Sequence, residues 1–283
     1  MNRKQRAEIA TETLQIINNA RYENQKGESI NIGDRLYLAK SQSKHYKPAM
    51  FDHIFLAVEQ IINAKDSNKE TQFEIVNETT LSAAKRLIVW SGKEDTVCLN
   101  FASAKNPGGG FINGSNAQEE SLARSSGLYP CISQMQEMYR ANKSFGSSLY
   151  TDNMIYSPRV PVFRDDRGIL LDFPYLLSII TSPAVNAGAA ISKEKINREI
   201  IENVMLERTK KVLSLAVINN HKNIILGAWG CGVFQNSPRA IARIFHKHLV
   251  ASSSFHGWFD KVVFAILDTS QNKHIIQHFR EKF

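Results

Sequence analysis

Cysteine is scarce in this sequence: only Cys98, Cys131 and Cys231 occur among 283 residues. An odd number of cysteines so far apart fits neither a disulfide framework nor a zinc site. The sequence also lacks any run of about 18 apolar residues, so no membrane-spanning helix is expected. The N-terminus begins with a polar, basic segment and has no apolar signal sequence. These absences predict a protein of the reducing cytoplasm that does not bind membranes.

Histidines at metal-binding spacing are absent as well. His246 and His248 are two residues apart in an expected helix, so their side chains point to different faces and cannot share a metal ion. We therefore expect no metal site. What the sequence does have is 43% hydrophobic residues, enough for a sizeable core, and a formal net charge of +8. This charge favours anionic partners such as nucleic acids or polyphosphorylated ligands without selecting among them.

From residue 70 onward, short apolar segments alternate with helical patterns. The expected strands are Phe73–Val76, Leu87–Trp90, Thr96–Phe101, Tyr175–Thr181, Asn223–Trp229 and Lys261–Leu267. Helices are expected near residues 79–86, 117–140, 193–219 and 238–251. This alternation is typical of an α/β fold whose mostly parallel or mixed sheet is covered by helices on both faces. Residues 141–172, rich in Ser, Asn, Asp and Pro, are expected to form a loop-like insertion over the sheet edge.

The first 70 residues follow a different pattern. Helices are expected near residues 3–20 and 51–64, with a polar, glycine-containing stretch between them. We expect residues 1–70 to form a helical extension and residues 71–283 to form the main domain. Basic side chains are expected to be solvated charges, or else to follow an anionic polymer; they are Arg3, Lys4, Arg6, Lys210 and Lys211.

A glycine-rich segment follows the expected strand Thr96–Phe101. Residues 106–120 read Asn-Pro-Gly-Gly-Gly-Phe-Ile-Asn-Gly-Ser-Asn-Ala-Gln-Glu-Glu. Adjacent glycines let a backbone approach a ligand where a side chain would block it. The paired glutamates offer acid/base chemistry at the start of a helix. The segment therefore predicts an enzyme that binds a phosphorylated or sugar-bearing ligand and cleaves or protonates it nearby.

A second loop repeats this arrangement after the expected strand Asn223–Trp229. It reads Gly-Cys-Gly-Val-Phe-Gln-Asn-Ser-Pro from Gly230 to Pro238. Ser237 is a good N-cap and Pro238 a good first helical residue. Glycine amides beside a helix N-terminus form a site for phosphate or diphosphate. Because ligands bind at the carboxyl ends of strands in open α/β sheets, the two loops are expected to form opposite walls of one cleft.

These residues resemble the macrodomain poly(ADP-ribose) glycohydrolases of the bacterial type. The family signature of three glycines, a short spacer and Gln-Glu-Glu matches Gly108, Gly109, Gly110, Gln118, Glu119 and Glu120. The stretch from Gly227 to Phe234 resembles the family's diphosphate-binding loop, and residues 157–164 and 181–186 are also similar to these proteins. The resemblance implies a three-layer α/β/α macrodomain, here residues 71–283, whose cleft holds ADP-ribose.

The resemblance implies catalysis by Glu120, the second glutamate of the signature. Adjacent helical residues point about 100° apart, so Glu119 is expected to hold a ribose hydroxyl while Glu120 reaches the scissile bond. The helix N-terminus favours charged carboxylates, whereas a neighbouring carboxylate and a phosphate-bearing ligand favour retaining one proton. Sequence leaves this balance open. The chemistry requires neither a metal nor another cofactor.

Other candidates have a functional and a plain structural interpretation each. Asn106 could hold ribose hydroxyls or only form a turn, and Phe234 could pack against the distal ribose or only fill the core. Glu78 could recognise adenine or start a helix as a solvated charge. Gln118 is expected to support the loop. The diphosphate is expected on backbone amides of Gly230, Cys231, Gly232, Val233 and Phe234, without a role for the thiol.

We therefore expect a monomeric enzyme that hydrolyses the ribose–ribose O-glycosidic bonds of poly(ADP-ribose), carried on modified proteins or nucleic acid. An alternative is a hydrolase that removes single ADP-ribose units from protein, nucleic acid or a small molecule. A non-catalytic ADP-ribose reader is a third possibility, but a reader does not need the two glutamates. A nucleic-acid-binding protein is suggested by charge alone, and no recognition motif accompanies it.

Overall fold

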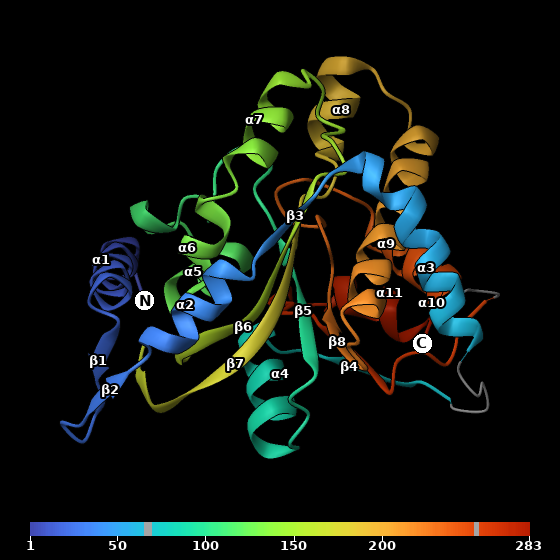
Figure 1. The fold of residues 1–283 in the computed structure, drawn as a ribbon. Helices are drawn as coiled ribbons and strands as arrows, with labels where there is room; N and C mark the ends of the chain where they lie inside the picture. The colour runs from blue at the N-terminus through green and yellow to red at the C-terminus, as the bar shows by residue number, and fades with distance from the viewer. Residues whose placement is uncertain (65–69, 252–254) are drawn as a thin grey trace.

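The computed structural model describes residues 1–64, 70–251 and 255–283. A seven-stranded mixed sheet forms its centre, with strand order β3-β6-β7-β5-β8-β9-β4 (Figure 1). The strands are β3 (Lys44–Tyr46), β4 (Gln72–Val76), β5 (Thr96–Phe101), β6 (Met154–Arg164), β7 (Leu170–Ser182), β8 (Asn223–Leu226) and β9 (Lys261–Ala265). Strands β7, β5, β8, β9 and β4 run parallel, whereas β6 is antiparallel to both β7 and β3.

Helices cover both faces of this sheet (Figure 1). One layer contains α3 (Phe51–Asn63), α9 (Arg198–Ile218), α10 (Pro238–Leu249) and α11 (His274–Arg280). The other contains α2 (Gly33–Ser41), α4 (Thr80–Lys85), α5 (Gln118–Ser125), α6 (Leu128–Ser133) and α7 (Gln136–Ser144). Helix α1 (Arg3–Asn19) lies outside α5, and α8 (Ala187–Glu194) precedes α9. The expected three-layer α/β/α fold with a mixed sheet is confirmed.

The central strands are apolar on both faces, as a sheet between two helical layers requires. Along β5, Val97 and Leu99 pack into the α9–α10 layer, whereas Cys98 packs into the α4–α6 layer. Strand β8 alternates in the same way, with Ile224 on one side and Ile225 on the other. Since side chains alternate along a strand, each central strand contributes to both cores.

The N-terminal segment is tied to the main sheet. Its β1 (Arg21–Glu23) and β2 (Ser29–Asn31) form a separate hairpin, but β3 is the edge strand beside β6. Helix α3 packs against α9. The division of the chain into residues 1–70 and 71–283 stays a prediction. No helix among the described residues is long and apolar enough to span a membrane.

The expected strand Leu87–Trp90 is wrong, because these residues belong to a π-helix, Arg86–Trp90, that continues α4. The run is rich in β-branched and aromatic residues, which suggested a strand. However, only Leu87 is buried, whereas Val89 and Trp90 are 50% and 70% exposed. In the described part of the chain the segment pairs with no strand, and it continues the preceding helix.

The expected loop-like insertion at residues 141–172 contains strand β6, which pairs antiparallel with β7. Pro158 and Pro161 obscured this strand because proline cannot donate a hydrogen bond to a sheet. The structure accommodates Pro158 by a register shift between Ser157 and Val160, where Arg159 adopts φ +47°. The expected helix at 117–140 likewise divides into α5, α6 and α7, and Ser126, between α5 and α6, forms an isolated bridge with Val162.

Candidate active site

The two glycine-rich loops follow the carboxyl ends of two central strands of the sheet. Strand β5 leads into the first loop and α5, and β8 leads into the second loop and α10. Because β5 and β8 are adjacent and parallel, their carboxyl ends bring the loops together. A cavity of about 360 Å³ lies between them. It is lined by Ser103, Gln118, Glu119 and Glu120 from the first side and by Gly230, Gly232, Val233 and Phe234 from the second.

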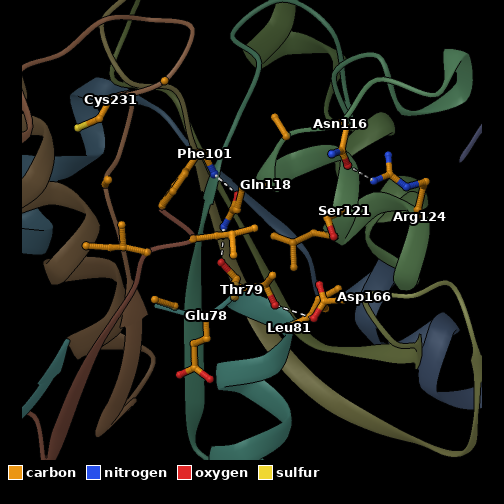
Figure 2. A pocket seen from close by; sticks show the side chains of 18 of the residues that line it. Glu78, Thr79, Leu81, Phe101, Asn116, Gln118, Ser121, Arg124, Asp166 and Cys231 are labelled. Carbon is orange, nitrogen blue, oxygen red and sulfur yellow. Dashed lines mark hydrogen bonds between the residues drawn. The ribbon is translucent and has the colours of Figure 1, made fainter. Parts of the chain in front are cut away.

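A second cavity of about 520 Å³ continues the first. The two share the lining residues Phe101, Ala117, Gln118, Ala228 and Gly232. Figure 2 shows Gln118 near the middle of the second cavity, with Cys231 on one side, Arg124 on another and Glu78 towards α4. The result is one elongated cleft with paired glutamates at one end and a half-buried carboxylate, Glu78, towards the other.

Glu120 is half-buried in the first turn of α5. Its Oε1 accepts a hydrogen bond from the Gly110 backbone N–H at 3.0 Å. Gly109 passes beside the same carboxylate with φ +59°. The triple-glycine loop thus holds the carboxyl group of Glu120 at the wall of the cavity and leaves part of it accessible.

Glu119 is buried behind Glu120 and is only 3% exposed. Its Oε2 accepts from the Ser103 N–H at 2.6 Å, and its Oε1 accepts from the Asn100 side-chain amide at 3.3 Å. Burial raises the pKa of Glu119 to about 8 despite these hydrogen bonds, and the neighbouring Glu120 carboxylate adds to the rise. The raised pKa favours the neutral form of Glu119, a carboxylic acid that can donate a hydrogen bond.

Gln118 joins the start of α5 to strand β5. Its Oε1 accepts from the Phe101 N–H at 2.8 Å, while its Nε2 donates to the carbonyl of Leu99 at 2.7 Å. The same amide nitrogen donates to the hydroxyl of Thr80 at 3.1 Å. Both ends of the amide are engaged by the protein, which fixes the helix start that carries the two glutamates.

The second loop presents backbone amides to the cleft. Gly230 adopts φ +71°, and a Cβ there would lie 2.6 Å from the Ala184 Cβ. The buried Asn236 side chain donates to the carbonyls of Val185 and Gly230 and fixes the loop from behind. The N–H groups of Gly232 and Val233 donate to no acceptor within the described residues. Such free amides suit an anionic ligand.

The start of α10 does not contribute to this cleft. Ser237 caps the helix as predicted, since its hydroxyl accepts from the Ala240 N–H, and Pro238 is the first helical residue. Both Ser237 and Ala240 line a separate cavity of about 20 Å³. An anion in the cleft would therefore meet the loop amides rather than the end of α10.

The chain is similar to a known group of enzymes. The family described as microbial-type PARG, catalytic domain, matches residues 10–165, which is more than half of the chain. The chain belongs to the microbial-type PARG family. The bacterial type of poly(ADP-ribose) glycohydrolase (PARG) implied by the signature residues is thereby confirmed.

Solved PARG structures agree with this assignment. PARG from Thermomonospora curvata is 40% identical, with coverage of 99% of this chain and 100% of that chain and a TM-score of 0.93. The same enzyme bound to the inhibitor ADP-HPD gives 39% identity, the same coverage and a TM-score of 0.89. Deinococcus radiodurans PARG in complex with ADP-ribose is 38% identical over 87% of this chain and 96% of that chain, with a TM-score of 0.81. No curated protein matches the chain.

Of the signature residues predicted from sequence, Gln118, Glu119 and Glu120 line the cleft, whereas the three glycines line neither of its cavities. Four other candidates have particular surroundings. Glu78 forms an ion pair with Arg86 at 2.8 Å. Asn106 is exposed and lines neither cavity of the cleft. Phe234 lines the cavity and packs against Tyr150, with ring centroids 6.0 Å apart. Burial raises the pKa of Cys231 to about 12, which leaves its thiol protonated. The ligand contacts of these residues stay predictions.

Several PARG cleft residues were missed by sequence reasoning. The buried Arg124 donates to the Ser115 carbonyl at 2.6 Å and to the Asn116 side chain at 3.0 Å. It follows Glu120 by four residues, so the helical period placed it on the same face and offered a signal. Asp166 lines the cleft and accepts from the Thr79 hydroxyl at 2.6 Å. Asp166 had no such signal, because it lies between β6 and β7, in the segment taken for an insertion.

Replacing Gly109 with valine should lower kcat/KM by about 10²-fold, because a displacement of about 1 Å in a catalytic group can have this effect. A Cβ at Gly109 would collide with the Glu120 Oε1 and lie 3.3 Å from the Glu119 Oε2. Steady-state hydrolysis of poly(ADP-ribose) measures the loss. Gly92→Val is the matched control, since Gly92 has φ +66° with nothing within 4 Å. Equal activity of the two variants would show that Gly109 does not position the glutamates.

Proposed function

We propose that this chain hydrolyses the ribose–ribose O-glycosidic bonds of poly(ADP-ribose) and releases ADP-ribose. The observation that carries the proposal is the pair of glutamates at one end of the cleft, with Glu120 held by the Gly110 N–H and Glu119 buried beside it. Family membership and the relatives that bind ADP-ribose or ADP-HPD support the same substrate. The loop from Gly230 to Phe234 binds the diphosphate through the N–H groups of Gly232 and Val233, whereas the Cys231 N–H donates to the Ala228 carbonyl at 3.1 Å.

Glu120 is the general acid/base in this reaction. In its protonated form it donates a proton to the departing ribose oxygen as the bond at the anomeric carbon breaks. The sugar acquires oxocarbenium-like character, which the nearby diphosphate stabilises. The Glu120 carboxylate then accepts a proton from the attacking water. One carboxylate thus serves in both steps, unlike the two-carboxylate arrangement of most glycosidases.

Glu119 binds the substrate as a neutral acid in this proposal. The Ser103 N–H and the Asn100 amide already donate to its oxygens, so the hydroxyl of the protonated group can donate to a ribose hydroxyl. A neutral Glu119 also avoids placing a second negative charge beside Glu120 and the diphosphate. Its neutrality therefore lowers the cost of bringing an anionic substrate into a buried site.

Labelled poly(ADP-ribose) and a mono-ADP-ribosylated protein, incubated separately with the purified chain, test the substrate. Release of ADP-ribose from the polymer is expected. Release from the mono-modified protein alone would replace the proposed activity with a mono-ADP-ribose hydrolase. Binding of both substrates without release of ADP-ribose would indicate a reader. The polymer carrier, a modified protein or nucleic acid, is tested by repeating the assay with polymer attached to each.

ADP-ribose should stabilise the fold against heat much more than adenosine does. Only ADP-ribose has the diphosphate that the amides of Gly232 and Val233 can bind. A ligand at 100 times its dissociation constant adds about 2.7 kcal/mol to the free energy of unfolding. This predicts a rise in melting temperature of at least about 2–4 °C in a thermal denaturation experiment. Equal stabilisation by adenosine would show that this loop does not bind the diphosphate.

A further inference from the structure

Helix α1 is attached to the loop that carries the glycine signature. The Arg6 Nε donates to the carbonyl of Gly114 at 2.8 Å, and the Arg3 Nε donates to the carbonyl of Asn113 at 3.0 Å. Arg3 is exposed, as expected of a solvated charge, but both arginines also make contacts that the sequence did not predict. Both arginines bind backbone carbonyls more than 100 residues away in sequence.

The contact between α1 and this loop is close and continuous. Gly114 adopts φ +73°, and a Cβ there would collide with the Arg3 carbonyl oxygen and lie 3.2 Å from the Ala7 nitrogen. Further along the helix, the fully buried Ala10 packs in one cluster with Phe111 and Ala123. The backbone of the loop thus lies directly against the backbone and apolar face of α1.

A second connection runs from α1 through Arg124. The buried Thr13 hydroxyl donates to the Arg124 carbonyl at 2.6 Å, and the Arg124 side chain donates to the Ser115 carbonyl. The Ser115 N–H donates in turn to the Gly110 carbonyl at 3.1 Å. Gly110 is the residue whose N–H donates to the Glu120 carboxylate. Contacts from α1 therefore converge on the turn that fixes Glu120.

We propose that α1 is a positioning element for Glu120, with Arg3 and Arg6 as positioning residues that act through the turn Asn113–Ser115. Without these contacts the turn loses the support on its outer side, and the Gly110 N–H no longer holds the carboxylate in one place. Arg3 and Arg6 lie before residue 10, where the family match begins. This inference rests on the proposed function of Glu120 as the acid/base.

Kinetics of full-length Arg3→Ala, Arg6→Ala and Gly114→Ala variants on poly(ADP-ribose) test the proposal. We expect kcat to fall about 10- to 100-fold, as for a small displacement of a catalytic group. In Arg3→Ala the affinity for ADP-ribose and the melting temperature should change little, because Arg3 is exposed and lines neither cavity of the cleft, whereas Arg6 lines the second one. Lys4→Ala is the matched control: Lys4 lies on the same helix and its ammonium group is 4.0 Å from Glu8.

Three outcomes would overturn the inference. Variants with wild-type kcat would show that Glu120 does not depend on α1. A rise in KM and in the dissociation constant of ADP-ribose at constant kcat would make α1 a substrate-binding element. A lower melting temperature with normal kcat per folded molecule would make it only a stabilising element. Failure of the proposed function gives a different result, since the wild-type chain itself would then release no ADP-ribose from the polymer.

Discussion

Replacing Glu120 with glutamine should reduce kcat on poly(ADP-ribose) by about 10⁴-fold or more and leave ADP-ribose binding largely intact. Removal of a general acid or base typically costs about 10²–10⁴ in rate. Because one residue serves both steps here, the upper end of this range or beyond is expected. Glutamine keeps the size of the side chain and an oxygen that can accept from the Gly110 N–H. It cannot deliver a proton or activate water.

The measurement is kcat from initial rates, together with the dissociation constant of ADP-ribose for each protein. Glu8→Gln is a suitable control, because this substitution removes the same charge from the chain at a side chain that is 62% exposed on α1. Near-normal turnover by Glu120→Gln would disprove the mechanism. A loss of ADP-ribose binding equal to the loss of activity would instead make Glu120 a substrate-binding residue.

Replacing Arg208 with methionine should have the largest effect on stability, about 3–5 kcal/mol in the free energy of unfolding. Arg208 is 1% exposed on α9, and its Nε donates to Asp152 at 2.7 Å. It also donates to the carbonyls of Leu149, Tyr150 and Pro183. Methionine fills a similar volume but leaves these buried acceptors without their donor. The free energy change corresponds to a fall in melting temperature of the order of 10 °C.

The electrostatics of this pair support the prediction. Burial lowers the pKa of Arg208, and Asp152 partly offsets that effect. Burial alone would raise the pKa of Asp152, but Arg208 and Lys211 lower it below its usual value. Removal of Arg208 therefore leaves the charged Asp152 carboxylate with Lys211 as its remaining ion-pair partner among the described residues. Arg243→Met is the matched control, since Arg243 pairs with Glu202 at the surface with 61% of its side chain exposed. Similar melting temperatures for the two variants would contradict the prediction.

The strands and loops that form the cleft could be predicted from sequence because their signals are local. Strand β5 has the predicted bounds, Thr96–Phe101, since six residues suited to burial precede the glycine-rich loop. Ser237 and Pro238 start α10 as expected, because an N-cap acts within one turn of its own helix. The glycine signature likewise places both glutamates in the first turn of α5.

Tertiary structure decided what depends on distant residues. Strand β6 forms despite its two prolines because β7 and β3 pair with it on either side. The segment Leu87–Trp90 has a strand-like composition but pairs with no strand among the described residues, and it is helical. Sequence left open how the site shifts the protonation of the glutamates. The burial of Glu119 among Asn100, Ser103 and the packed core raises the pKa of that carboxyl group, since desolvation depends on everything that surrounds the group.

The contacts of the first helix also depend on residues that are distant in sequence. Sequence predicted α1 from its periodicity, with bounds one residue from those observed, Arg3–Asn19. Nothing in that pattern indicated that Arg6 would bind the Gly114 carbonyl or that Gly114 would lie against Arg3. Backbone hydrogen bonds and side-chain patterns act over a few residues, so they determine where helices and strands form. Which loop a helix packs against depends on the folded sheet, and that placement is what joins α1 to the catalytic turn.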